Sequence, residues 1–418
     1  MRDGTAHRRI ERFHELEWVL NEVIGRVFPL TGNELLRPLD AIGRTVTEDV
    51  FAPVDRPPYD ASHMDGYAVR SSELRGASRE RPVVLKVDGF TGPNERGPPL
   101  GPGCARRILT GGYMPEGADA VVPQEEVTVE GGSVSVRRPL RPFEYVDRVG
   151  SDLRRGSVVV RAGEVLTPVK GALLETLGVR SVRVMRLPEV GVLSFGSELT
   201  DDPVEADAGK VLNTHAPMVV SMLKKLPCRP RYLGLIPDDL DAARAALKTA
   251  LEKSDMVLTI GGSSVSELDV VPMVLSEVSD FFAQGLKMQP GRVGGAAVVN
   301  GRPVIVLPAL VHSTVNVLNE LGVPVLAHLA SAKLDQFFAL TVATLSEPVV
   351  FHKWIDFVKV VWVSVSRSDG RLTCRPHLSE SSVFSSIAFS DGYLTVRPHL
   401  ERLEAGAEVV VKRPLWML

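Results

Sequence analysis

From residue 187 onward, short apolar segments alternate with amphipathic ones, and this alternation limits the possible folds more than any other feature. The near-continuous apolar segments are 189–195, 231–236, 255–260 and 302–308. Between them, 239–254 and similar stretches have apolar residues at helical spacing. Strands that are apolar on both faces are typical of a parallel sheet covered by helices on both sides. We therefore predict an α/β domain with a mostly parallel sheet over 187–330, closed by a helix at 312–330.

The remainder of the 418-residue chain divides into three further predicted units. Residues 51–149 are rich in Pro, Gly and short β-like runs, including a hairpin at 127–136, and predict an inserted β-rich lobe. Residues 1–50 and 150–186 are assigned to one helical and extended unit that this lobe interrupts. The tail at 331–418 predicts a small β-barrel, with a sandwich as the alternative.

Two helices are predicted for the interrupted unit. Residues 14–27 have an amphipathic pattern. The second helix has Thr167 as its cap, Pro168 at its first position and Gly178 at its end. The two stretches are expected to belong together.

Composition excludes several classes of protein. A net charge of −3 gives no electrostatic case for a nucleic-acid partner. The three cysteines are widely separated, which argues against a disulfide framework and a structural zinc site. No apolar run of about 18 residues predicts a membrane span, and the polar first fifteen residues show no signal peptide. We expect a cytoplasmic protein.

Ligands of open parallel sheets bind outside the carboxyl ends of the strands. Here Gly261 and Gly262 follow a predicted strand directly, and glycines let the backbone approach a phosphate closely. Ser263 and Ser264 add hydroxyl donors, and the next helix offers free N–H groups to an anion. The loop at 261–269 is therefore predicted to hold a phosphorylated ligand.

Carboxylates accompany this loop at the same predicted edge. Glu198, Asp238 and Asp269 could together hold Mg²⁺ against phosphate oxygens, because hard cations take oxygen ligands. The alternative is that Asp238, Asp239 and Asp269 cap helices while Glu198 is solvated. Each aspartate alone is more typical of a cap, but their grouping at one edge favours the ligand site.

Two turn-rich segments of the lobe also stand out. Residues 60–68 (DASHMDGYA) place Asp65 after a Pro-rich approach, where it is either a turn residue or functional. Residues 110–117 (TGGYMPEG) are more typical of a plain loop.

These segments, in this order, resemble the molybdopterin molybdenumtransferase family (MoeA) and the related E domain of gephyrin. The matching motifs are D-x-S-x-M-D-G-Y-A at 60–68, T-G-x-x-x-P-E-G at 110–117, G-x-D-x-x-x-G at 150–156, G-x-E-L at 196–199 and G-G-x-S-x-G-x-x-D at 261–269. The resemblance covers nearly the whole chain. It implies an elongated homodimer whose 187–330 domain is like that of the MoaB/Mog-type molybdopterin adenylyltransferases, with such an adenylyltransferase as a possible partner.

The reaction implied by the resemblance uses adenylated molybdopterin, molybdate or tungstate, and Mg²⁺. The pyrophosphate bond is hydrolysed, AMP leaves, and the metal enters the dithiolene. Catalytic roles carry over to Asp65, Asp152, Asp238 and Asp269, with Asp65, Asp152 and the substrate-binding Thr110 reaching the cleft across the dimer. The other implied substrate-binding residues are Glu198, Gly261, Gly262, Ser263, Ser264, Pro290, Gly291, Arg292, Pro308, Ser313, Lys359 and Ser381.

The chain departs from the family at clustered positions. Ser266 replaces a loop glycine, and Ser197 replaces the aspartate of G-D-E-L. The motifs K-P-G-K-P and L-P-G-N-P-V-S read here QPGRV at 289–293 and LPALVHS at 307–313, and Lys359 replaces an arginine. We interpret the nucleotide-phosphate side as kept and the oxyanion side as rebuilt or lost, with Lys287 a candidate replacement. The alternative function is an impaired paralogue that binds molybdopterin or its adenylate as a carrier or scaffold.

Overall fold

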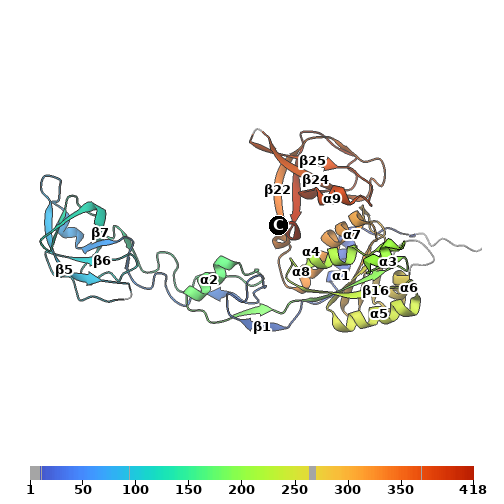
Figure 1. Cartoon of the computed structure of the whole chain (residues 1–418), viewed down its shortest axis with the longest axis horizontal. Coiled ribbons are helices and arrows are strands. Elements are labelled where there is room, and N and C mark those ends of the chain that lie inside the picture. Colours follow the sequence, from blue (N-terminus) through green and yellow to red (C-terminus); the bar gives the residue numbers. More distant parts are fainter. Residues whose placement is uncertain (1–9, 11, 94, 263–269, 369) are drawn as a thin grey trace, which may run out of the picture.

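The computed structural model describes residue 10 and residues 12–93, 95–262, 270–368 and 370–418. Figure 1 shows an elongated molecule with a β-rich lobe at one end. A slender unit containing β1 and α2 connects this lobe to an α/β domain, above which lies a C-terminal β-barrel. The lobe and the α/β domain, which the sequence predicts to share a binding cleft, therefore lie at opposite ends of the elongated molecule.

The α/β domain has a six-stranded sheet in the order β16-β13-β17-β21-β20-β18. Four strands are mutually parallel: β13 (Glu189–Phe195), β16 (Arg229–Ile236), β17 (Met256–Ile260) and β21 (Arg302–Leu307). The strands β18 (Phe281–Gln284) and β20 (Gly295–Val299) extend it antiparallel and were not predicted. The mostly parallel sheet is confirmed.

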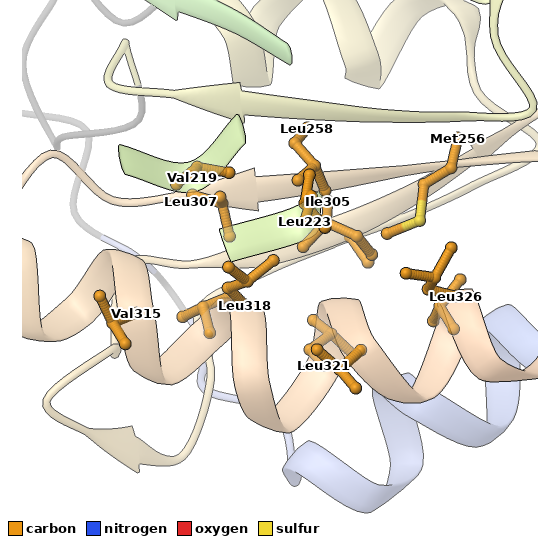
Figure 2. Packing of buried hydrophobic residues seen from close by; sticks show 14 of the residues in the cluster. Val219, Leu223, Met256, Leu258, Ile305, Leu307, Val315, Leu318, Leu321 and Leu326 are labelled. Atoms are coloured by element: carbon orange, nitrogen blue, oxygen red, sulfur yellow. The ribbon is translucent and has the colours of Figure 1, made fainter. Parts of the chain in front are cut away.

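Helices cover both faces of this sheet. They include α4 (His215–Leu223), α5 (Leu240–Lys253), α6 (Val270–Val278), α7 (Val311–Val317) and α8 (Val323–Leu329). The short α3 (Pro203–Asp207) packs instead on a small parallel pair, β14 (Leu199–Thr200) and β15 (Val211–Leu212). The predicted helix at 312–330 is interrupted by a π-helical turn at Leu318–Gly322 between α7 and α8. Successive strand residues point to opposite faces of the sheet. Val257 therefore joins the hydrophobic cluster under α5 and α6, and Leu258 joins a second cluster under α4, α7 and α8. Figure 2 shows Leu258 and Ile305 of that second cluster above Leu318 and Leu321.

The lobe is a second six-stranded sheet, ordered β7-β4-β6-β5-β9-β8. Its strands are β4 (Gly66–Val69), β5 (Val83–Thr91), β6 (Cys104–Ile108), β7 (Ala120–Pro123), β8 (Val127–Glu130) and β9 (Ser133–Val136), with 3₁₀ turns at Ser71–Leu74 and Gln124–Glu126. The hairpin of β8 and β9 is the one predicted. A short pair, β3 (Ala61–Ser62) and β10 (Val146–Asp147), lies beside the sheet.

Two further strand pairs and α2 (Pro168–Thr176) form the connecting unit. The pairs are β1 (Asn33–Leu36) with β12 (Val182–Met185) and β2 (Val50–Phe51) with β11 (Val158–Val160). Thr167 caps α2 through a bond from the Lys170 N–H, and Gly178 follows the helix at a φ of +82°, as predicted.

The other predicted helix, α1 (Leu16–Ile24), lies elsewhere than expected. Val19 and Val23 are fully buried in the core cluster of the α/β domain, whereas α2 contributes to a separate cluster. The expectation that both helices share one unit is therefore wrong. Its cause is physical: an apolar helix face packs where a complementary surface exists, which sequence spacing does not specify.

The C-terminal unit is a closed barrel of five strands. They are β22 (Phe338–Leu345), β24 (Val358–Ser368), β25 (Arg371–His377), β26 (Gly392–Val396) and β28 (Glu408–Pro414), and closure comes from the pairing of β24 with β26. Accessory elements are β19 (Met288–Gln289), β23 (Val349–Val350), β27 (Arg402–Leu403), α9 (Phe384–Ala388) and 3₁₀ turns at Leu334–Phe337 and Leu415–Met417. The barrel, rather than the sandwich, is confirmed.

Within the described part of the chain, every helix is too short or too polar to cross a bilayer.

Candidate functional site

The predicted turns meet at the carboxyl edge of the α/β sheet. The Gly261 N–H donates to the Leu307 carbonyl at 3.1 Å, which joins the ends of β17 and β21. The Gly196 N–H donates to the Ile236 carbonyl at 3.1 Å, which joins the ends of β13 and β16. The four strand ends thus form one continuous edge, as a parallel arrangement requires.

Gly261 and Gly262 occupy positions that only glycine suits. Their φ angles are +81° and +58°. A Cβ on Gly261 would lie 2.5 Å from the Phe195 carbonyl oxygen, and one on Gly262 would lie 2.9 Å from the Phe195 Cβ. The turn after β17 therefore packs directly on the end of β13. Ser263, Ser264, Ser266 and Asp269 lie outside the described residues, so the roles expected of them stay predictions.

Asp238 and Ser197 form a reciprocal pair of hydrogen bonds. The Ser197 N–H donates to Asp238 Oδ2 at 2.8 Å, and the Asp238 N–H donates to Ser197 Oγ at 3.0 Å. Asp239, in contrast, caps α5 by accepting from the Ala242 N–H at 2.8 Å. The cap interpretation therefore holds for Asp239 and not for Asp238. Ser197, a departure from the family motif, supplies part of this contact with its hydroxyl.

Glu198 lies on the same loop as Ser197. Its Oε2 is 2.8 Å from the position that a Cβ of Gly196 would take, so the carboxylate folds over that glycine. Among the described residues there is no cluster of three or more His, Cys, Asp or Glu side chains placed to hold a metal. Two carboxylates, Glu198 and Asp238, nevertheless flank one turn, and Mg²⁺ commonly binds one or two carboxylates together with substrate phosphates. The donor chemistry fits Mg²⁺.

A polar network that the sequence did not predict runs from the buried Ser194 and Asn213 to the exposed Asp201 and Tyr232. Ser194 Oγ donates to Asn213 Oδ1 at 3.1 Å, and Asn213 Nδ2 donates to Asp201 Oδ1 at 2.8 Å. Tyr232 donates its hydroxyl proton to Asp201 Oδ2 at 2.8 Å, and burial together with this carboxylate raises the pKa of Tyr232. The only signal in the sequence was a serine inside an otherwise apolar strand.

A second group of predicted residues lies in and beside the lobe. The Thr110 N–H and Oγ1–H both donate to Asp65 Oδ1, at 2.7 and 2.8 Å. These bonds lower the pKa of the exposed Asp65 carboxyl, so it is ionised at neutral pH. Arg56 Nε donates to Asp152 Oδ2 at 2.8 Å. Thr110, expected from spacing to be plain loop, thus orients the carboxylate of Asp65.

The lobe lies at the opposite end of the molecule from the carboxyl edge of the α/β sheet (Figure 1). Asp65 and Thr110 therefore do not meet Glu198 and Asp238 within one chain.

Two of the departures from the family motifs, Gln289 and Lys359, contact each other on the barrel side of the α/β domain. Lys359 Nζ donates to Gln289 Oε1 and to the Lys353 carbonyl, each at 2.6 Å. Lys359 is only 4% exposed, and burial lowers its pKa. Its ammonium thus faces the glutamine that replaces the family's lysine. The candidate replacement, Lys287, is engaged elsewhere, with Glu15 at 2.7 Å and Asp356 at 3.4 Å.

The remaining predicted residues gather around α7. Pro308 accepts at its carbonyl from Thr314 Oγ1 at 2.5 Å, and Ser313 is 6% exposed. The carbonyl of Ser381 accepts from the His312 backbone N–H at 3.1 Å, so the tail serine does reach this edge. In the preceding segment, Pro290 lies within reach of α7, Gly291 has a φ of +139°, and the exposed Arg292 guanidinium lies 5.4 Å from the Trp354 ring centre.

Comparisons with known proteins agree along the chain. Family models match in three consecutive segments: "MoeA N-terminal region (domain I and II)" at 14–178, "Probable molybdopterin binding domain" at 191–328 and "MoeA C-terminal region (domain IV)" at 347–413. The molybdopterin molybdenumtransferase of Staphylococcus aureus (strain COL) is 32% identical over 338 residues, which are 80% of each protein. The chain belongs to the molybdopterin molybdenumtransferase family. Its general role is therefore in molybdenum cofactor biosynthesis.

Two further relatives give the same assignment. The Bacillus subtilis molybdopterin molybdenumtransferase is 38% identical over 269 residues, which are 62% of each protein. The crystal structure of the molybdopterin biosynthesis MoeA protein of Pyrococcus horikoshii OT3 superposes with a TM-score of 0.83 at 26% identity, covering 96% of this chain and all of that one. The whole architecture, including the remote lobe, is thus that of the family.

Acid should weaken the contact between the barrel and the α/β domain. Burial lowers the pKa of His312 below its ordinary 6.5, so between its folded pKa and 6.5 the unfolded chain binds more protons than the folded one. The contribution of His312 to the free energy of unfolding is therefore fully present above pH 6.5. It falls as the pH drops from 6.5 to the folded-state pKa of His312.

We expect the thermal unfolding midpoint to fall less between about pH 7.5 and pH 5.5 in His312→Gln than in the wild type. The reason is that the glutamine amide binds no proton in this range, so the variant lacks the proton uptake that favours the unfolded chain. Identical dependence of the unfolding midpoint on pH in the variant and the wild type would contradict a lowered pKa of His312.

Proposed function

We propose that the protein inserts molybdate or tungstate into adenylated molybdopterin in an Mg²⁺-dependent reaction that releases AMP. The observation that carries this proposal is the carboxyl edge of the sheet, where Glu198 and Asp238 flank a tight turn beside Gly261 and Gly262. Glycine turns let a phosphate approach the backbone closely, and carboxylates beside them suit a metal ion that bridges to the phosphate oxygens. The pyrophosphate of the adenylate is the phosphate group that such an edge would hold.

Each part of the site has a proposed role. Gly261, Gly262, Ser263 and Ser264 bind the pyrophosphate, and Glu198, Asp238 and Asp269 would hold Mg²⁺, which when bound supplies charge to the phosphate oxygens. Water displaces AMP at phosphorus as the P–O bond breaks. The oxyanion then exchanges an oxygen ligand for the two dithiolene sulfurs, and that oxygen leaves as water with the protons of the two thiols. The segments that would hold the oxyanion and the pterin side contain Pro290, Gly291, Arg292, Pro308, Ser313, Lys359 and Ser381.

A second subunit would complete the cleft. Asp65, Thr110 and Asp152 belong to a part of the chain remote from its own α/β edge, so we propose that they act on the site of a partner in a homodimer. The ionised carboxylate of Asp65, oriented by Thr110, would be the group that this partner contributes. We place the reaction in the cytoplasm, with a molybdopterin adenylyltransferase supplying the substrate.

A second candidate function follows from Lys359. Its ammonium is buried and bonded to Gln289 and to a backbone carbonyl, so it would have to be released before it could bind an oxyanion. This observation favours an impaired paralogue that binds molybdopterin or its adenylate as a carrier or scaffold and does not insert metal.

The test is AMP release from adenylated molybdopterin by the full chain, with Mg²⁺, in the presence and absence of molybdate or tungstate. We expect release that depends on the oxyanion. Tight binding of the adenylate without release would establish the second function, and absence of binding would contradict both.

A further inference from the structure

Helix α7 carries two buried polar side chains one helical turn apart. His312 is 3% exposed and Asn316 is fully buried. Residues four apart lie on the same side of a helix, one above the other. Because an unbonded buried polar group is costly, the hydrogen-bond partners of these two side chains show what α7 holds in place.

His312 holds the segment of the barrel that leads into α9. Its backbone N–H donates to the Ser381 carbonyl at 3.1 Å, and its Nε2 lies 2.6 Å from Ser386 Oγ and 3.1 Å from the Val383 carbonyl. Ser386 Oγ already donates its proton to the Val383 carbonyl at 2.7 Å. The third neighbour of Nε2, Ser379 Oγ at 3.4 Å, donates its own proton to Ser386 Oγ at 2.8 Å. All three neighbours are therefore acceptors, which assigns the donor proton to Nε2.

Asn316 holds two other segments. Its Nδ2 donates to the Pro290 carbonyl at 3.1 Å, and its Oδ1 accepts from Trp362 Nε1 at 3.0 Å. Trp362 is 1% exposed and belongs to β24, the strand that also carries Lys359. One short helix at the sheet edge thus bonds to the turn at 289–292, to β24 and to the segment at 381–386.

We infer that His312 and Asn316 are positioning residues that form a clamp, here called the α7 clamp. It sets Ser381, Arg292 and Lys359 at fixed places relative to Ser313 on α7 itself. The family motif has a valine at position 312, so this chain has replaced an apolar side chain with a hydrogen-bond donor at the point where the barrel meets the α/β domain. The identity of the held segments as substrate-binding rests on the proposed function, whereas the clamp itself does not.

The clamp can be tested on the full chain without substrate. His312→Val removes the side-chain donor and restores the family residue, while His312→Gln keeps an N–H near the place of Nε2. We expect amide hydrogens in peptides 311–317 and 379–390 to exchange at least about 10-fold faster in His312→Val and to recover in His312→Gln. Peptides from β13 and β17 should be unchanged.

Two neighbouring serines of α9 provide a matched control. Ser386→Ala should accelerate exchange of the same peptides, because its hydroxyl bonds to His312. Ser385→Ala, on the exposed side of α9, should not. Unchanged exchange in His312→Val, no recovery in His312→Gln, or acceleration spread over the whole barrel would each overturn the clamp.

Turnover separates the clamp from the proposed function. In oxyanion-dependent AMP release, His312→Val should lower kcat at least about 10-fold with little change in KM for the adenylate, and His312→Gln should restore it. An unchanged kcat in His312→Val would overturn the positioning role. A wild type without AMP release would contradict the proposed function, and the exchange experiment would still decide the clamp.

Discussion

Asp238→Asn should lower Mg²⁺-dependent AMP release by on the order of 100-fold or more, with little effect on folding. The amide oxygen of asparagine can still accept from the Ser197 N–H, so the bond that fixes the 196–198 turn survives. The substitution does, however, remove the negative charge that would attract the phosphate-bound Mg²⁺. The measurement is the initial rate of AMP release at several Mg²⁺ concentrations, with unfolding followed in parallel.

The adjacent residue supplies the control. Asp239→Asn removes the same charge one position along the chain, but asparagine caps α5 as well as aspartate does. We expect its rate to remain within about twofold of the wild type. If both variants lose activity equally, general electrostatics of the loop would explain the result, and Asp238 would have no specific role.

Gly261→Ala should destabilise the α/β domain by about 2–5 kcal/mol and abolish adenylate binding. The alanine would have to adopt a φ of +81°, and its Cβ would lie 2.5 Å from the Phe195 carbonyl oxygen. Since backbone cannot yield as a flexible side chain does, β13 and β17 would have to separate at the edge that carries the site. Hydrogen exchange in peptides from β13 and β17 isolates this domain from the other units of the chain.

Gly301→Ala is a control that introduces the backbone strain of a positive φ without a steric clash of the new Cβ. Gly301 lies in the turn between β20 and β21 of the same sheet, has a φ of +73°, and has open space around the position of a Cβ. Its substitution should cost only the strain of the left-handed backbone, about 1–2 kcal/mol. Equal losses for the two variants would show that the contact with Phe195 is not important.

Local patterns were sufficient for much of the architecture. The apolar strands and the amphipathic helices of the α/β domain, the hairpin at 127–136 and the cap at Thr167 all depend on residues close in the chain. The sequence also placed Gly261 and Asp238 at one edge, because parallel strands connected through helices bring their carboxyl ends together.

Other features depend on contacts between residues far apart in the chain, and no spacing encodes them. The sequence alone determined that an α/β sheet would present glycine turns and carboxylates at its carboxyl edge. Only the tertiary structure decided that α1 joins this domain, that Asp238 bonds to Ser197, and that Gln289 engages Lys359. The physical reason is that secondary structure follows from local backbone and periodicity preferences, whereas each of these contacts depends on which surfaces become neighbours when the whole chain packs.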